Sequence, residues 1–132
     1  DSRVININFP IQSGSSRIVR RMGREYDPQK VLQVLYEIKS INPGLVIKTN
    51  IMTGFPGETL NDFFASIKSL SAFDVIYYVK FTLRPNTGAF LYKDQVPETT
   101  KNLRFLLLSL AVFYRHLTVL FKSLFNVKLM FR

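Results

Sequence analysis

The stretch L-V-I-K-T-N-I-M-T-G-F-P-G-E-T, residues 45–59, decides the fold expected of this chain. Its first eight residues are rich in apolar and β-branched side chains, which is typical of a strand buried on both faces. A turn with two glycines follows, and Thr59 with Asp62 three residues later fits the capping box of a helix. The sequence therefore predicts a strand, a tight turn and a helix in succession.

Upstream, residues 3–9 (R-V-I-N-I-N-F) mostly alternate apolar and polar side chains, so we expect a short strand there. The loop Q-S-G-S then leads into a short helix. Ser15 or Ser16 is its expected N-cap, and Gly23 is its expected stop.

A longer helix is expected next, with Asp27 as its N-cap, Pro28 in its first turn and N-P-G at residues 42–44 as its end. Downstream of the second strand and its helix, residues 75–83 (V-I-Y-Y-V-K-F-T-L) predict a third strand, which ends in R-P-N-T-G-A. The order of elements is thus β-α-β-α-β-α.

Strands joined by helical crossovers pair in parallel, with right-handed connections. The fold class we expect is α/β: a partial (β/α) barrel sector with three parallel strands and a C-terminal helical tail. A wound sheet is the alternative. In either architecture the loops at the carboxyl ends of the strands, Q-S-G-S, G-F-P-G-E-T and R-P-N-T, converge on one face. Functional residues are expected on that face.

Composition limits the chemistry of the chain. It has 132 residues, a formal net charge of +9 and no cysteine, so it offers no disulfide, no thiolate zinc site and no ligands for a cysteine-bound iron–sulfur cluster. Six basic and no acidic residues lie in residues 101–132. Such a balance favours a polyanion such as RNA as a partner, although a solvated basic face is the alternative.

Two loops suit a small ligand. Gln12, Ser13, Gly14 and Ser15 combine an amide and two hydroxyls with a glycine that admits a ligand to the backbone, ahead of a helix N-terminus that favours anions. In the run from Gly54 to Thr59 two glycines bracket a proline, which also suits close backbone approach. The alternative for both loops is an ordinary capped turn.

Arginines provide further candidates. Arg84 follows the third strand, where its guanidinium could hold a carboxylate, or it could be a surface residue. Arg17, Arg20, Arg21 and Arg24 cluster about the first helix, either as a solvated face or as contacts for phosphate or a ligand carboxylate. The only histidine, His116, lies in an apolar segment and is expected to be structural.

Taken together, the segments P-I-Q-S-G-S, R-M-G-R-E-Y, N-I-M-T-G-F-P-G-E-T, T-L-R-P-N-T-G-A and Q-V-P resemble the radical S-adenosylmethionine (SAM) methylthiotransferases, which act on tRNA or on a ribosomal protein. The likeness covers about residues 4–104. It implies a partial (β/α) barrel whose first half carries a CxxxCxxC loop and a [4Fe–4S] cluster, and a transferase that uses SAM. Neither that loop nor any other cluster ligand is present in this chain.

The resemblance also implies roles for particular residues. It assigns no catalytic residue and no metal ligand to this chain, and it places cofactor contacts at Gln12, Ser13, Gly14, Ser15, Arg24, Gly54, Phe55, Pro56, Gly57, Glu58, Thr59 and Arg84. These residues would position SAM. Hydrogen abstraction and the insertion of sulfur and methyl would depend on a missing N-terminal half, so we expect the chain to be inactive alone.

The last part of the chain departs from the resemblance. Residues 1–104 are expected to form the C-terminal part of the radical SAM domain, and residues 105–132 an apolar, basic helical tail in place of an RNA-binding domain. The run 105–114 is too short to span a bilayer before Arg115 and His116. No spanning segment is therefore predicted. A buried or partner-covered helix is expected, with a membrane-surface helix as the alternative.

The function predicted from these features is a cytoplasmic fragment of a radical SAM methylthiotransferase that positions SAM for methylthiolation of a tRNA adenosine. Two alternatives stay open. One is a non-catalytic remnant or basic module that binds RNA or a protein partner. The other is a radical SAM enzyme of another subfamily.

Overall fold

The structure is a computed structural model that describes residues 5–130, with side-chain burial described as far as residue 125. Within that range three parallel strands form one sheet in the order β1 (Asn6–Asn8), β2 (Val46–Thr53) and β3 (Val75–Lys80). The predicted parallel pairing is confirmed. The first predicted strand is shorter than expected, and its residues 3 and 4 lie outside the described part of the chain.

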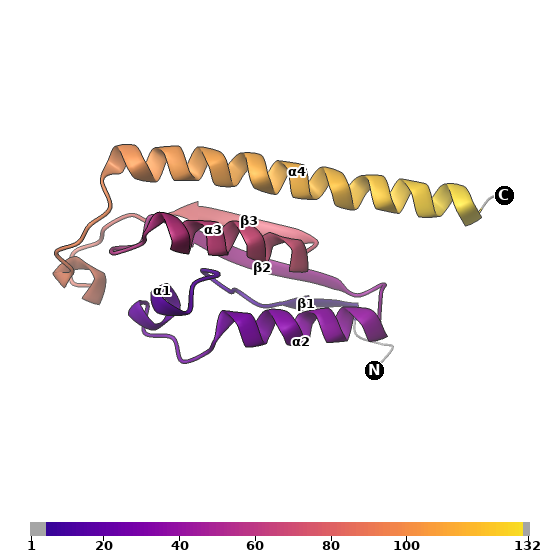
Figure 1. Ribbon diagram of the computed structural model, residues 1–132, viewed down its shortest axis with the longest axis horizontal. Helices are drawn as coiled ribbons and strands as arrows, with labels where there is room; N and C mark the ends of the chain where they lie inside the picture. The colour runs from indigo at the N-terminus through magenta and orange to yellow at the C-terminus, as the bar shows by residue number, and fades with distance from the viewer. Residues whose placement is uncertain (1–4, 131–132) are drawn as a thin grey trace.

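The helices follow the predicted order (Figure 1). They are α1 (Ser16–Arg21), α2 (Pro28–Ile41), α3 (Leu60–Ser69) and α4 (Glu98–Met130), with short 3-10 helices η1 (Leu70–Ala72) and η2 (Gly88–Leu91). Ser15 caps α1, Asp27 caps α2 with Pro28 in the first turn, and Thr59 and Asp62 form the capping box of α3. The predicted helix starts are therefore confirmed, because each rested on a side chain that can accept a backbone N–H.

Within residues 5–130, helices cover one face of the sheet and leave the other open. Burial alternates along the whole of β2, so this strand is not buried on both faces as its apolar run suggested. The covered face carries Ile7, Ile47, Thr49, Ile51 and Ile76, and the open face carries Asn6, Asn8, Lys48, Asn50, Met52, Tyr77 and Val79. A sheet with helices on one face alone has the arrangement of a barrel sector, since a doubly wound sheet carries helices on both faces.

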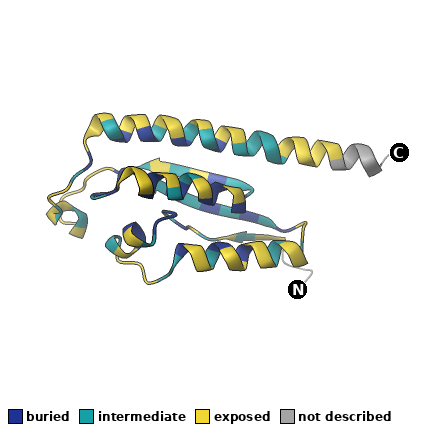
Figure 2. Cartoon of the chain, viewed as in Figure 1, coloured by how far each residue is buried: buried dark blue, intermediate teal, exposed yellow. Residues whose placement is uncertain are grey.

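The main core lies between the covered face and three helices. Leu32 and Leu35 of α2, Phe63 of α3, and Leu108 and Val112 of α4 pack into one cluster with the isoleucines of the sheet. Figure 2 shows the dark, buried positions of these elements turned toward one another. A second cluster, Ile18, Phe55 and Phe81, lies where the predicted loops meet at the carboxyl ends of the strands.

The C-terminal helix is longer and more exposed than expected. α4 begins at Glu98 and runs without interruption across residues 104 and 105, where the sequence suggested a boundary. Leu108 and Val112 are buried, but Leu106, Leu110 and other large apolar residues of α4 are exposed. The run 105–114 is thus buried along one side only, and cover of its other side by a partner stays a prediction. In length and composition the stretch Glu98–Phe125 could cross a membrane, a weak criterion that core helices of soluble proteins also meet.

The orientation of α4 can be tested with two leucines that lie two residues apart. Leu108 is fully buried, and Leu106 is 55% exposed. We expect Leu108→Ala to lower the free energy of unfolding by about 2–5 kcal/mol because it leaves a cavity, and Leu106→Ala to change it by less than about 0.5 kcal/mol. Urea denaturation followed by circular dichroism measures both. Equal losses would mean that α4 docks through a different face.

Candidate ligand site at the carboxyl ends of the strands

A hollow of about 440 Å³ opens where the three strands end. The predicted loop residues Gln12 and Phe55 and the predicted Arg24 contribute to its wall. Other lining residues are Arg21, Met22, Gly23, Met52, Phe81, Gly88, Ala89 and Tyr92. The hollow falls within the size range of small-molecule sites and lies at the edge of the sheet where parallel α/β folds bind ligands.

Gln12 reaches the hollow through an uncommon backbone conformation. Its φ is 61°, in the left-handed region that few non-glycine residues adopt. The backbone nevertheless stays in the parallel ladder, since the Gln12 N–H donates to Asn50 O at 2.8 Å and its carbonyl accepts from the Met52 N–H at 2.8 Å. A residue held in this way beside a pocket is typical of functional sites.

The next three predicted residues turn away from the hollow and contact α3. Ser13 is fully buried with its hydroxyl 3.1 Å from the Ser66 hydroxyl, and the Gly14 N–H donates to Ser66 Oγ at 2.9 Å. A Cβ on Gly14 would lie 2.2 Å from the Ala65 carbonyl oxygen. The glycine therefore allows close packing of the loop against the helix, and Ser15 Oγ donates to Asp62 at 2.5 Å.

The second predicted loop has a mixed role. A Cβ on Gly54, whose φ is 82°, would meet the Lys101 side chain at 2.7 Å, so this glycine admits α4 rather than a ligand. A Cβ on Gly57 would meet Asp94 and Arg21. Pro56 is buried, and Thr59 caps α3. Phe55 is the residue of this loop that lines the hollow, where its ring meets those of Phe81 and Tyr92 edge-on at centroid distances of 5.2 and 6.2 Å.

Glu58 is buried behind the loop in a contact with α4. Its carboxylate accepts hydrogen bonds from the Gly54 N–H at 3.0 Å and from Arg104 Nη1 at 2.7 Å, and Arg104 also donates to the Glu58 carbonyl at 2.9 Å. Burial raises the pKa of the Glu58 carboxyl above its usual value, although these donors oppose the rise. The pair fixes the start of α4 to the second loop, which the sequence did not indicate.

The arginines separate into different roles. Arg84 is exposed and does not line the hollow. Arg17 pairs with the Asp62 carboxylate and donates to the Gly57 carbonyl at 2.6 Å, whereas Arg20 is exposed. Arg21 and Arg24 line the hollow. The arginine cluster noted in the sequence is thus neither wholly a solvated face nor wholly a ligand site.

One wall of the hollow is formed by a segment that sequence reasoning missed. The Arg21 guanidinium lies 4.2 Å from the centre of the Tyr92 ring and pairs with Asp94 at 2.7 Å, while Tyr92 Oη donates to the Arg21 carbonyl at 3.1 Å. Among the described residues, Arg21 Nε is one of three buried side-chain polar atoms without a hydrogen-bond partner. No pattern marks Tyr92, because it reaches α1 only through the tertiary fold.

Asp62 holds the two loops together. Its carboxylate accepts from Ser15, from Arg17 and from the N–H and hydroxyl of Thr59. Burial alone would raise the pKa of this carboxyl, but the hydrogen bonds outweigh it and lower the pKa from 3.8 to about 2. The carboxylate is therefore ionised across the physiological range and serves as a fixed acceptor.

The hollow combines three aromatic side chains with two guanidinium groups. Aromatic rings can pack against a planar base, and guanidinium groups can bind a carboxylate or phosphate. The lining therefore combines groups that can contact a planar ring with groups that can bind an anion. Residues 5–130 bring together no group of three or more His, Cys, Asp or Glu side chains that could hold a metal ion.

Known proteins from several bacteria that share one name are similar to this chain. No family model matches the chain. It is 40% identical over 101 residues to a tRNA-2-methylthio-N(6)-dimethylallyladenosine synthase of Clostridium botulinum, across 75% of this chain and 22% of the relative. Proteins of the same name from Acidithiobacillus ferrooxidans and Cutibacterium acnes are 40% and 39% identical, over 73% and 70% of this chain and 22% and 19% of their own lengths. The chain thus spans about a fifth of the relatives it matches.

The role of Asp62 predicts a pH dependence. Its carboxyl has a lowered pKa in the folded chain, so its stabilisation is present above about pH 4 and is lost as the pH falls toward about 2. We expect Asp62→Asn to cost about 1–2 kcal/mol of unfolding free energy at pH 7 and progressively less below pH 4. Urea unfolding between pH 7 and pH 2.5 measures this difference.

The control variant is Glu25→Gln, which removes a carboxylate from an exposed loop position. It should change the unfolding free energy by less than about 0.5 kcal/mol at any of these pH values. A loss in Asp62→Asn that stays constant down to pH 2.5 would show that the charge of Asp62 does not link the loops.

Proposed function

Since the matched three quarters of this chain make it a member of the methylthiotransferase family, we propose that it supplies the SAM-positioning part of a radical SAM methylthiotransferase. The observation that carries this proposal is the hollow at the carboxyl ends of the strands, with Gln12, Arg24 and Phe55 in its wall. These three residues come from positions that the family resemblance associates with the cofactor.

Each wall of the hollow has a role in this proposal. The guanidinium group of Arg24 binds the carboxylate of SAM, and the rings of Phe55, Phe81 and Tyr92 enclose its adenosyl part. Arg21, paired with Asp94, holds the Tyr92 ring in the wall. SAM bound here supplies the methyl group and the radical-forming sulfonium of the reaction. The protein residues bind and orient it, and the aromatic wall excludes water from one side.

The remaining residues that the resemblance assigns to SAM support the site indirectly. Ser13, Gly14 and Ser15 fix the first loop against α3, and Glu58 fixes the second loop to Arg104. Gly54, Pro56, Gly57 and Thr59 shape the turn that presents Phe55. We propose that their contribution to SAM affinity is to hold the wall in place, and that Arg84, which is exposed, contacts the ligand or substrate from the rim.

The open face of the sheet is the proposed approach for the substrate, a tRNA adenosine. Asn6, Asn8, Lys48, Asn50 and Tyr77 lie on this face, and Met52 of the same face lines the hollow. Amide and amine groups can bind a base or a phosphate, and the Tyr77 ring offers a stacking surface. The net charge of +9 favours the polyanionic substrate over a ribosomal protein.

The [4Fe–4S] cluster of the family does not fit this chain. The sequence has no cysteine, and the described residues hold no cluster of alternative ligands. We propose that another polypeptide segment with the cluster cysteines completes the enzyme in the cytoplasm, and that this chain is inactive without it. The second candidate, a non-catalytic module that binds RNA or a partner, is favoured by the same lack of cysteines together with the basic charge.

Calorimetric titration of the chain with SAM tests the ligand site. We expect Arg24→Ala to weaken SAM binding by about tenfold, since it removes a charged donor to the carboxylate. Arg20→Ala removes the same charge from an exposed position of α1 outside the hollow and should leave the affinity unchanged. An absence of SAM binding combined with salt-dependent RNA binding would favour the non-catalytic module.

A chimera tests the reaction. The matched residues of this chain replace the corresponding segment of the Clostridium botulinum synthase, which supplies the rest of the enzyme. We expect the chimera to form 2-methylthio-adenosine in tRNA, detected by mass spectrometry of nucleosides, and its Arg24→Ala form to lose about tenfold in activity at limiting SAM. A chimera that binds SAM and leaves tRNA unmodified would contradict the proposed substrate.

A further inference from the structure

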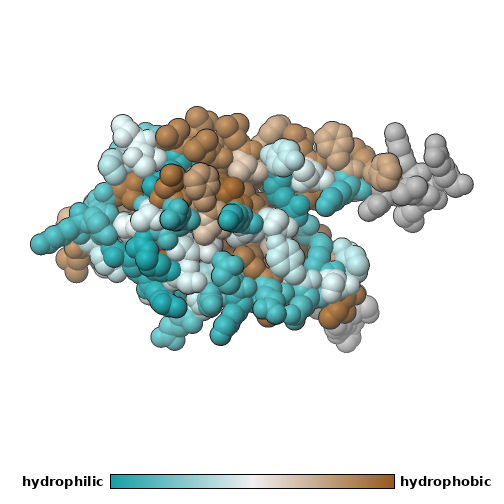
Figure 3. Space-filling model, viewed as in Figure 1, coloured by the Kyte–Doolittle hydropathy of each residue, from teal (hydrophilic) through white to brown (hydrophobic). Residues whose placement is uncertain are grey.

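α4 presents its apolar side to solvent. Its sheet-facing side carries Lys101 and Arg104, which are buried, together with Leu108 and Val112. The outward side carries large apolar residues that are 42–70% exposed, namely Leu103, Leu106, Leu107, Leu110, Phe113 and Tyr114. A surface helix of a globular protein shows the reverse arrangement, with its apolar stripe toward the core. Figure 3 shows the apolar side chains gathered along α4, above the more polar α2.

The stripe continues where α4 passes beyond the sheet (Figure 1). Leu120, Phe121, Leu124 and Phe125 are 53–66% exposed and repeat the i, i+3, i+4 spacing of the first part. Apolar residues follow one another at spacings of three or four, which keeps them on one side of the helix. They occupy positions 103, 106, 110, 113, 117, 121 and 124. At 100° per residue, the basic residues Arg104, Arg115 and Lys122 fall about 140–160° from the centre line of these positions, on the opposite side of the helix.

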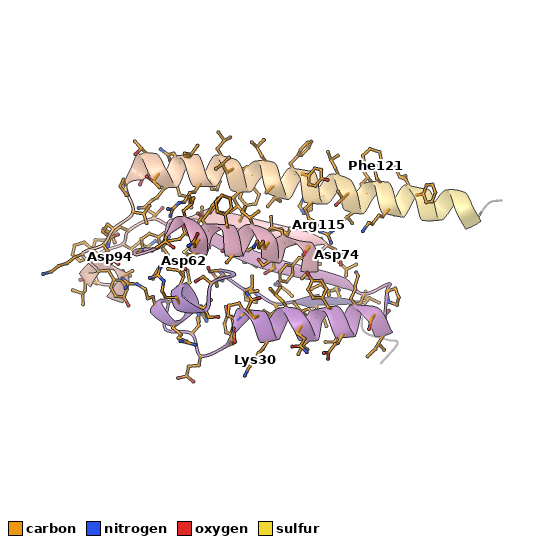
Figure 4. The ribbon with its side chains drawn as sticks, viewed as in Figure 1. Lys30, Asp62, Asp74, Asp94, Arg115 and Phe121 are labelled. Atoms are coloured by element: carbon orange, nitrogen blue, oxygen red, sulfur yellow. The ribbon has the colours of Figure 1, made fainter. Side chains whose placement is uncertain are left out.

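Hydrogen bonds fix the rotation of α4 about its axis. Arg104 binds Glu58, Arg115 Nε donates to the Phe73 carbonyl at 2.9 Å, and His116 Nε2 accepts from the Ile76 N–H of the edge strand β3 at 3.2 Å. In Figure 4 Arg115 lies on the side of α4 toward the sheet, and Phe121 lies away from it. The helix cannot roll to bury its stripe without breaking these bonds.

Charge distinguishes between the partners that could cover the stripe. The whole chain carries a net charge of +9. On α4, Lys101, Arg104 and Arg115 are engaged on the domain side, and Lys122 is exposed. A second copy would place this charge opposite itself, with no carboxylate in the tail to offset it. An anionic lipid surface is complementary to it, and leucine and phenylalanine are side chains that enter the boundary between headgroups and acyl chains.

The attachment of α4 to the domain favours a position on the membrane over one across it. A spanning helix would draw Arg104 and Arg115 into hydrocarbon and away from Glu58 and the Phe73 carbonyl. A helix that lies flat keeps both contacts on its aqueous side while its opposite side enters the lipid. The 33 residues of α4, about 50 Å of helix, then lie parallel to the surface.

We infer that α4 is a membrane-surface helix: it binds an anionic lipid bilayer through the stripe from Leu103 to Phe125, with the α/β domain on the aqueous side. The inference is independent of SAM binding, because it uses neither the hollow nor its lining residues. Lipid is thus the proposed partner of the stripe. Binding of a second copy through the stripe, or a helix that spans the bilayer, would contradict the proposal.

The chain contains no tryptophan, so the tryptophan fluorescence of a variant comes from the one tryptophan that is introduced. Phe121→Trp lies in the stripe, and Tyr36→Trp lies on α2 at a comparable exposure outside it. With vesicles of phosphatidylcholine containing about 30 mol% phosphatidylglycerol, we expect a blue shift of emission for Phe121→Trp and none for Tyr36→Trp. A shift at both positions or at neither would overturn the inference.

Sedimentation with the same vesicles measures affinity. We expect the double variant Leu110→Glu/Phe113→Glu to bind at least about tenfold more weakly, and Val34→Glu/Ile41→Glu, a matched change on exposed positions of α2, to bind as the unchanged chain does. Raising salt from about 0.1 M to about 0.5 M should weaken binding by several-fold. Circular dichroism verifies that each variant is folded.

Three results would overturn the inference. One is equal binding of the stripe variant and the α2 variant. Another is a dimer in analytical ultracentrifugation that the stripe variant abolishes, together with no vesicle binding, since that result assigns the stripe to a second copy. The third is retention of the chain in vesicles after extraction with alkaline carbonate, since a surface helix is released and a spanning helix is not.

Discussion

The carboxylate of Asp62 is the contact on which the arrangement of the loops depends. It completes the capping box at the start of α3, accepts the hydroxyl of Ser15 at the start of α1, and pairs with Arg17. Two helix starts that follow different strands are thereby brought to one acceptor. Without a fixed ionised group at this point, the first loop would have no polar anchor on α3 beyond Ser66, and Gln12 and Phe55 would not be held beside the same hollow.

The sequence predicted the elements well because their signals are local. Asp27 with Pro28, Ser15 and the pair Thr59 and Asp62 are side chains that satisfy backbone donors a few residues away, and such caps can be read from spacing alone. The prediction that β2 is buried on both faces was wrong, and the one-sided burial of α4 was not predicted, for one shared reason. An apolar run shows that a segment avoids water, but it does not show which sides of the segment the rest of the fold covers.

The hollow opens where the sequence predicted that the strand-end loops converge, but only some of the predicted residues line it. Parallel strands place their following loops at one edge, so the convergence of these loops can be predicted from the sequence. Within those loops, glycines and serines that suggest a ligand serve helix packing instead, as Gly14 does against Ala65. Tyr92 and Phe81 enter the wall, and Arg104 supports it, through contacts with segments from about 25 to 71 residues away. Such distant pairings leave no periodicity or spacing in the sequence.

The parallel register has a consequence for the order in which the chain folds. Asn6 pairs with Val46 and Lys48 pairs with Val75, so each strand pairs with the next strand only across a helical crossover. During synthesis β1 has no strand partner until α1, α2 and β2 have been made, and the edge of β3 meets His116 only after most of α4 has followed. The nascent chain therefore exposes unpaired strand edges for most of its synthesis, which makes early helix formation and chaperone contact important to its yield.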